Sequence, residues 1–92
     1  MERKCFLCGK NGANDPLERH HVFPGKNRHL SDVYGAVVDL CGNECHRNGQ
    51  FSAHRNASVR LMLEKTFQRK IMDEYNMDTN DFIFVFGRNY LD

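Results

Sequence analysis

The four cysteines are spaced in a way that suits a metal ion. They form two pairs, Cys5-x2-Cys8 and Cys41-x3-Cys45. A gap of two or three residues lets two thiolates reach one ion from a turn, and tetrahedral zinc takes four such ligands. The spacing predicts one structural zinc held by all four cysteines, with four free buried thiols as the alternative. A site closed by four thiolates has no open position for a substrate, so it would stabilise the fold and carry no reaction.

The histidines form a second set of candidates. His20 and His21 are adjacent. His46 comes directly after the second cysteine pair, and His54 follows a short distance later in the chain. Imidazole binds divalent ions and acts as a base near neutral pH. At a strand end, where the chain bends, two adjacent histidines can act on one substrate, one holding an ion while the other activates water. An ordinary solvated or core histidine is the alternative, and for His29 the sequence decides nothing.

Short strands and two helices are expected to position these residues. Strands are predicted over 17–23, ended by the Pro24-Gly25 turn, and over 36–40, with a polar connection over 26–32. From about residue 57, apolar residues recur every fourth position and predict a long amphipathic helix. Its stripe consists of Val59, Leu63, Phe67, Ile71 and Tyr75, with Met62 and Met72 beside them. Asp78 or Thr79 would cap a last short element containing "FIFVF", and Gly87 would end it. Its β-branched and aromatic residues favour a strand, whereas the capping residues favour a short helix, which is the form we expect.

Length and charge narrow the class of protein. A chain of 92 residues makes one small domain, and it contains no apolar run long enough for a signal peptide or a membrane span. We therefore expect a cytoplasmic protein, whose thiols stay reduced. Residues 1–70 hold 12 of the 13 Lys and Arg, whereas residues 71–92 hold one Arg and five acids, Asp92 among them. A basic body suits a polyanion partner, although an uneven mixed surface is an equal alternative.

The segment "LERHHVFPG…AVVDLCGNECHRNGQFSAHRN" resembles the HNH endonuclease motif. The resemblance covers about residues 5–56, and the tail "FGRNYL" is similar to small phage-encoded HNH proteins. It implies an α+β fold: a small ββα-metal (His-Me finger) nuclease motif stapled by zinc, followed by a long amphipathic helix and a short C-terminal element. Residues 1–92 would form a single HNH nuclease domain, with the zinc and ββα-metal core at about 5–56 and the helical part at about 57–92.

The activity that this resemblance implies is metal-dependent hydrolysis of DNA phosphodiester bonds, as an endonuclease or nickase. His20, His46 and His54 would hold one catalytic divalent ion (Mg²⁺, Mn²⁺, Ni²⁺ or Zn²⁺), and His21 would be the general base. Gln50 and Asn56 are the fallback ligands if His54 is not one. The residues expected to hold phosphates of the DNA are Arg19, Lys26, Arg28, Arg47 and Arg55. The protein would be encoded by a phage or prophage and act in the cytoplasm of the bacterial host, with no membrane partner.

One position departs from the family pattern. The central Asn that fixes the loop of the catalytic histidine would fall near Ala36, and Asn43 lies inside the second cysteine pair instead. Two other functions therefore stay open. The chain could be a zinc-stabilised nucleic-acid-binding module without catalysis, or a phage packaging or recombination accessory protein whose acidic C-terminal end binds another protein.

Overall fold

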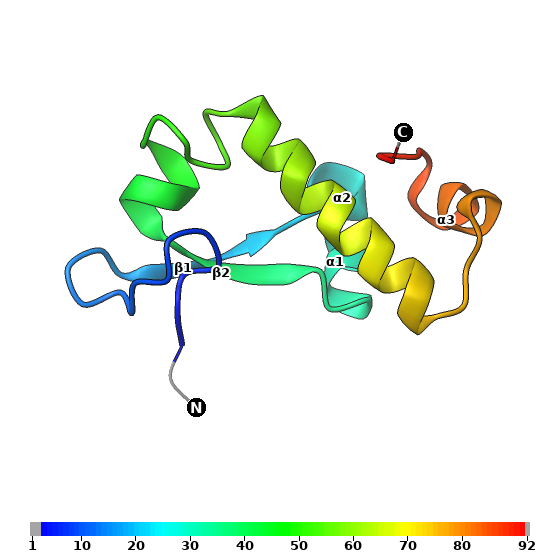
Figure 1. The fold of residues 1–92 in the computed structure, drawn as a ribbon, viewed down its shortest axis with the longest axis horizontal. Helices are drawn as coiled ribbons and strands as arrows, with labels where there is room; N and C mark the ends of the chain where they lie inside the picture. Colours follow the sequence, from blue (N-terminus) through cyan, green and yellow to red (C-terminus); the bar gives the residue numbers. More distant parts are fainter. Residues whose placement is uncertain (1–2, 92) are drawn as a thin grey trace.

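Two short antiparallel strands lie at the centre of the computed structural model, which describes residues 3–91 (Figure 1). β1 (Leu17–His21) pairs with β2 (Val37–Cys41), so that Leu17 lies opposite Cys41 and His21 opposite Val37. A 3-10 turn η1 (Gly25–Asn27) and helix α1 (Arg28–Val33) connect the strands. After β2 come the π-helical segment η2 (Gly42–Arg47), α2 (Ala57–Glu74) and α3 (Thr79–Phe86). The fold is therefore a small α+β fold.

The corner after β1 is held by a buried serine. The first strand ends at His21, two residues before the predicted end, although the amide of Val22 still donates to the carbonyl of Ala36 at 2.9 Å. The hydroxyl of Ser31 accepts from the amide of Phe23 and donates to the carbonyl of Phe23, both at 2.9 Å. These bonds turn the chain away from the sheet. They also fix α1 in a stretch for which the sequence predicts only a polar connection.

The long helix α2 forms where the sequence predicts it, with Asn56 as its N-cap. The Asn56 side chain accepts from the amide of Val59 at 3.1 Å. The buried face is made by Leu63, Phe67, Gln68 and Ile71. Tyr75, predicted to belong to the apolar stripe, is 50% exposed, and Met62 is 43% exposed. The stripe therefore covers the middle of the helix only.

Gln68 lies in the core, where its side chain hydrogen-bonds to the segment after α3. Its Nε2 donates to Oδ1 of Asn89 at 2.7 Å, and its Oε1 accepts from the amide of Tyr90 at 2.8 Å. A buried amide is tolerated when its donors and acceptors are satisfied in this way. The segment after α3 is thus fixed against α2.

The capping signals around "FIFVF" predict α3 correctly. Asp78 and Asp81 form a reciprocal capping box, and Gly87 ends the helix at φ +89°. Phe82 and Phe86 are buried and pack on Phe23, with ring centroids at 5.9 and 4.8 Å. This aromatic contact joins the last helix to the corner after β1. Phe84, on the other face of α3, is 90% exposed.

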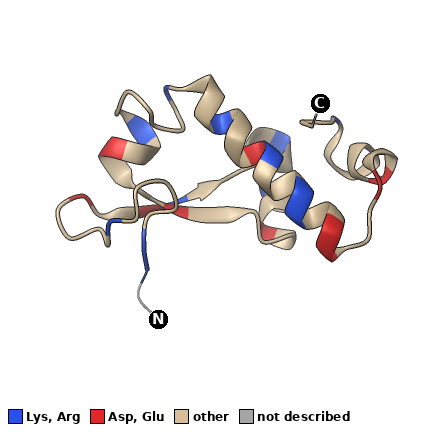
Figure 2. Ribbon diagram, in the orientation of Figure 1, with Lys and Arg blue, Asp and Glu red and all other residues tan. Residues whose placement is uncertain are grey.

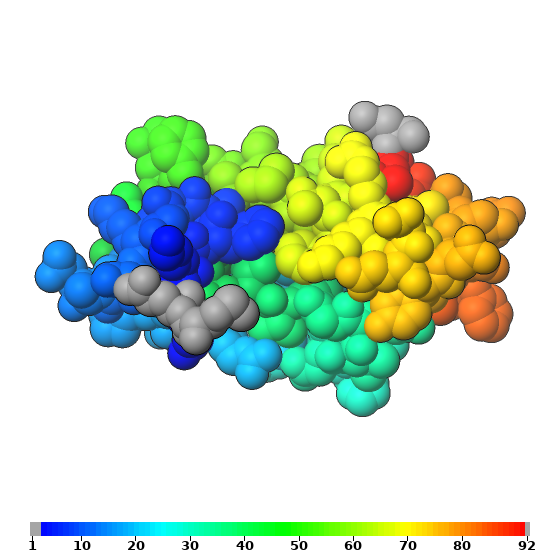
Figure 3. Space-filling model, turned by 60° about the horizontal axis from the view of Figure 1, so that its bottom comes forward, coloured from blue at the N-terminus to red at the C-terminus, as the bar shows by residue number. Residues whose placement is uncertain are grey.

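The N-terminal segment also packs on α2. The rings of Phe6 and Phe67 are 5.8 Å apart, and Figure 3 shows this blue segment lying directly beside α2. Acidic residues gather where α2 ends and α3 begins, whereas most Lys and Arg lie elsewhere (Figure 2). Asp92, counted with the acidic end in the sequence, lies outside the described residues. None of the helices within residues 3–91 has the length and apolarity needed to span a membrane.

Candidate metal centres and the basic cleft

The four cysteines come together from two parts of the chain. The sulfur atoms of Cys5, Cys8, Cys41 and Cys45 all lie within 4.8 Å of one another, and the Sγ atoms of Cys8 and Cys41 are 3.5 Å apart. In a tetrahedral zinc site with Zn–S bonds of about 2.3 Å, sulfur atoms lie about 3.8 Å apart. The four thiols therefore fit the ligand sphere of one zinc ion, as the spacing of the two pairs predicts.

The electrostatics of the thiols also favour a cation. Burial raises the pKa of Cys5, but backbone amides of Cys8, Cys41 and Leu7 outweigh this effect and lower the pKa to about 6. Burial is the largest cause that raises the pKa of Cys41, and the neighbouring thiols of Cys8 and Cys5 add to it, so that the pKa reaches about 12. The same causes raise the pKa of Cys45. Once one thiolate has formed, its neighbours resist ionising, because like charges repel at this distance. A divalent cation would remove that conflict.

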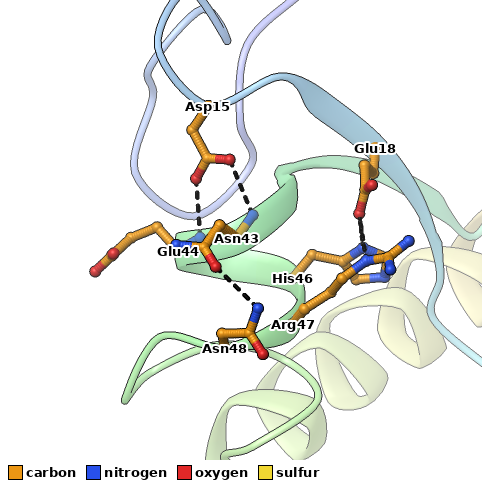
Figure 4. Close-up of polar contacts among 7 residues, drawn as sticks. All are labelled: Asp15, Glu18, Asn43, Glu44, His46, Arg47 and Asn48. Carbon is orange, nitrogen blue, oxygen red and sulfur yellow. Dashed lines mark hydrogen bonds and ion pairs between the residues drawn. The ribbon is translucent and has the colours of Figure 1, made fainter.

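Two loops complete the cysteine site. The amide of Gly9 donates to the carbonyl of Cys5 at 2.9 Å, and the φ of +80° at Gly9 lets the chain turn after Cys8. On the other side, η2 starts directly after Cys41 and is held by Asp15, whose carboxylate accepts from the amides of Asn43 and Glu44 at 2.9 Å (Figure 4). These amides lower the pKa of Asp15. The carboxylate therefore caps the segment that carries Cys45 and His46.

Three histidines form a second cluster of potential ligands. One ring nitrogen from each of His20, His46 and His54 lies within 4.8 Å of the others. The ring centroids of His46 and His54 are 4.4 Å apart, and that of His20 lies 5.2 Å from His46. His20 comes from the end of β1 and His46 from η2. Three imidazoles that converge in this way can hold one divalent ion and leave its other positions open.

His54 reaches the cluster because the loop after η2 folds back on itself. The amide of Ala53 donates to the carbonyl of Cys45 at 2.8 Å, and that of His54 to the carbonyl of His46 at 3.0 Å. A side chain at Gly49 would place its Cβ 2.0 Å from the carbonyl oxygen of Glu44, so only glycine fits this close approach. The side chain of Asn56, a fallback ligand, caps α2 instead, and Gln50 is exposed.

The ring orientation of His46 is set by Glu18. Nδ1 of His46 lies 2.9 Å from Oε1 of Glu18, which also accepts from Nε of Arg47 at 2.8 Å (Figure 4). These hydrogen bonds lower the pKa of Glu18, so the partner is a carboxylate at neutral pH. Because a carboxylate only accepts, Nδ1 carries the proton and Nε2 is left with a free lone pair.

The environment keeps His20 neutral. Its side chain is buried, and this burial, with His46 and His54 nearby, lowers the pKa of His20 to about 4. Desolvation and the neighbouring His46 also lower the pKa of His54. Neutral imidazole is the form that binds metals, so protons compete little for His20 at neutral pH.

His21 is separate from the three-histidine cluster but opens onto the same cleft. Its Nε2 lies 3.0 Å from Oδ1 of Asp32 on α1. A cleft of about 330 Å³ is lined by Arg19, His20, His21, Pro24, Gly25, Arg28, His46, Arg47 and His54. Adjacent residues on a strand face opposite ways, but His20 and His21 occupy the end of β1 and both reach the cleft.

The basic residues expected from the sequence divide into two groups. Arg19, Arg28 and Arg47 line the cleft. Lys26 and His29 are exposed but are not among its lining residues, and Arg55 donates to the carbonyl of Asn48 at 3.0 Å, which holds the loop. Ala36 is buried, and its backbone takes part in holding the corner beside His21, its carbonyl accepting from Val22 and its amide donating to the carbonyl of Ser31.

Three residues of the site do not emerge from the sequence pattern. Arg60 donates from one guanidinium nitrogen to the carbonyls of Ala53 and His54, at 2.9 and 3.0 Å. Asp32 and Glu18 each hold one histidine. Only Glu18 carries a signal that could have been used, because strand alternation puts it on the same face as His20.

Comparison of the chain with protein-family models, with curated proteins and with solved structures finds no match.

Proposed function

We propose that this protein is a metal-dependent DNA endonuclease or nickase of the HNH type, with its catalytic ion held by His20, His46 and His54. The observation that carries the proposal is the convergence of these three imidazoles in a cleft that also holds His21 and three arginines. A module that only binds nucleic acid has no need for three imidazoles meeting at one point. Burial, with His46 and His54 nearby, also lowers the pKa of His20 to about 4, which keeps this imidazole in the neutral form that binds an ion.

The order of elements supports this proposal. His20 lies at the end of the first strand, and His46 and His54 lie between the second strand and α2. This arrangement is compatible with the ββα-metal motif that the sequence resembles. In the proposed protein the structural zinc would fix η2 at Cys41 and Cys45, directly before His46. The zinc would thus hold one catalytic ligand in place without taking part in the reaction.

The cleft residues have distinct roles in the proposed hydrolysis. A divalent ion bound by the histidines would supply Lewis-acid stabilisation of the charge on the scissile phosphate. His21 takes a proton from the attacking water, so it acts only in its neutral form. Arg19, Arg28 and Arg47 bind the flanking phosphates and place the scissile bond beside His21. Glu18 shares its carboxylate between His46 and Arg47, and so links an ion ligand to a phosphate-binding residue.

A plasmid-nicking assay tests the function. Purified protein is incubated with supercoiled DNA and Mg²⁺, Mn²⁺, Ni²⁺ or Zn²⁺, and the relaxed and linear products are measured. We expect cutting with at least one ion, and a loss of about 10²-fold or more in His21→Ala, which removes the base. His29→Ala is the matched control, because His29 is exposed and is not among the residues that line the cleft.

Two results would overturn the catalytic assignment. One is a wild-type protein, loaded with zinc and folded, that cuts no DNA with any of the four ions. The other is equal cutting by the wild type and His21→Ala. If DNA binding persisted without cutting and fell with rising salt, the non-catalytic binding module would replace the nuclease.

A further inference from the structure

Within residues 3–91, the charged side chain at hydrogen-bond distance from His21 is that of Asp32 on α1. Its Nε2 lies 3.0 Å from Oδ1 of Asp32. The side chain of His21 is 17% exposed and that of Asp32 is 57% exposed. The carboxylate of Asp32 is therefore at the protein surface, whereas most of the His21 ring is buried. The two residues are eleven positions apart, and α1 brings them together.

The position of Asp32 is fixed by its neighbour in the chain. Ser31 is fully buried and makes two hydrogen bonds to the backbone of Phe23, while its carbonyl accepts from the amide of Ala36 at 2.8 Å. These bonds attach α1 to the corner that follows His21. The backbone of Asp32 is therefore held rigidly relative to the end of β1, and the contact with His21 does not depend on a flexible loop.

We infer that Asp32 is a positioning residue that holds His21 in the tautomer with its proton on Nε2. A carboxylate has no proton to donate, so the short contact requires Nε2–H to be the donor. In the neutral ring, the lone pair then lies on Nδ1. This inference rests on the proposed function, because it names Nδ1 as the atom that accepts the proton of the attacking water.

The proposed hydrolysis moves one proton to His21 and returns one proton to the leaving oxygen. One proton of the water moves to Nδ1 as the water oxygen forms its bond to phosphorus. The bond from phosphorus to the leaving oxygen breaks, the electron pair stays on that oxygen, and the oxygen takes a proton from solvent. The ring then carries a positive charge, which the carboxylate of Asp32 stabilises at hydrogen-bond distance. Asp32 touches neither the substrate nor the ion in this scheme.

The tautomer can be measured without any nuclease activity. Nitrogen-15 NMR of the imidazole rings in the zinc-loaded full chain reports which nitrogen of His21 carries the proton. In the wild type we expect the Nε2–H form to predominate, in Asp32→Ala a mixture of the two forms, and in Asp32→Glu the restoration of the Nε2–H form. Asp73→Asn, which removes one acidic charge near the end of α2, should leave the His21 signals unchanged.

Nicking kinetics give the second readout. Asp32→Ala should lower kcat about 10-fold to 100-fold with a change in KM of less than about 3-fold, because the base is misoriented while the phosphate contacts remain. Asp32→Glu should recover part of the lost kcat, since it restores a carboxylate that can accept from Nε2–H. An Nε2–H form that is equally populated in wild type and Asp32→Ala would overturn the inference. If the tautomer responds as expected but the wild type cuts no DNA, the proposed function fails and the Asp32–His21 pairing stands.

Discussion

The carboxylate of Glu18 lies 2.9 Å from Nδ1 of His46 and 2.8 Å from Nε of Arg47. Glu18 thus orients His46, a proposed ion ligand, and restrains Arg47, a proposed phosphate-binding residue, at the edge of the same cleft. Gly42 makes this possible, because a Cβ there would lie 2.9 Å from Cδ of Glu18. The histidine cluster and the arginines of the cleft are therefore connected through the carboxylate of Glu18.

Replacing Glu18 should weaken the histidine site. In Glu18→Gln the charged partner of His46 is lost, and the affinity for the ion should fall about 10-fold to 100-fold. A calorimetric titration of the zinc-loaded protein with Ni²⁺ measures this affinity. Glu44→Gln is the matched control, because the Glu44 side chain points away from His46 in Figure 4. Equal Ni²⁺ affinities in wild type and Glu18→Gln would show that Glu18 does not support the ligand.

Removing two thiols should release one zinc ion. The double variant Cys5→Ser/Cys41→Ser leaves only two thiolates at the cysteine cluster, too few to hold zinc tightly. Metal analysis should show the loss of one tightly bound zinc per chain, with a large fall in Tm, because structural zinc contributes directly to folding. The single variant Cys8→Ser, at the exposed member of the cluster, gives a milder test if the double variant does not fold.

The histidine cluster provides the control for this experiment. His20→Ala/His54→Ala removes two imidazole ligands and should retain the zinc of the cysteine cluster. A folded Cys5→Ser/Cys41→Ser protein that still holds its tightly bound zinc would contradict the four-cysteine site.

Asp15 should stabilise the fold in a pH-dependent way. The amides of Asn43 and Glu44 hold the pKa of Asp15 below its ordinary value of 3.8. Because the pKa is lowered on folding, the stabilisation is fully present above 3.8 and is lost as the pH falls through the lower pKa of the folded state. Asp15→Ala should therefore lower Tm by several degrees at pH 7 and by less at pH 3.

The measurement is the difference in Tm between wild type and Asp15→Ala at each pH. Loss of zinc in acid affects both proteins, so this difference isolates the carboxylate. The neighbouring exposed Asn14→Ala serves as control and should show a small difference at both pH values. A difference between wild type and Asp15→Ala that grows in acid would contradict the capping role.

Residue types and spacing predict much of this architecture. The two cysteine pairs meet as their spacing predicts, and α2 and α3 form where the periodicity and the capping residues place them. These features depend on local signals: ligand gaps in a turn, apolar repeats, and the Asp78 cap with Gly87. The convergence of His20, His46 and His54 follows less directly, because it also requires Gly49 to bring the loop close to Glu44.

The remaining features depend on tertiary contacts that no local pattern encodes. Helix α1 is only six residues long and is held by the buried hydroxyl of Ser31, so periodicity does not reveal it. The core position of Gln68 depends on where Asn89 and Tyr90 return to α2. The sequence places Asp32 in a polar connection and does not show its pairing with His21, because that pairing requires the turn that Ser31 makes.

Arg60 should determine how well the loop of His54 is ordered. Its guanidinium donates to the carbonyls of Ala53 and His54 from the first turns of α2, so it ties the last histidine to a rigid helix. Arg60→Met keeps much of the aliphatic stem but removes both hydrogen bonds, at a cost of about 1.5 kcal/mol in the free energy of unfolding. The affinity of the histidine site for Ni²⁺ should fall several-fold as well, because His54 would lose its fixed position.

Arg69→Met, an exposed substitution on the same helix, should leave both the free energy of unfolding and the Ni²⁺ affinity unchanged. If Arg60→Met lowered the stability but left the Ni²⁺ affinity at its wild-type value, His54 would not be a ligand, and the ion would have to be held by His20 and His46 with another group.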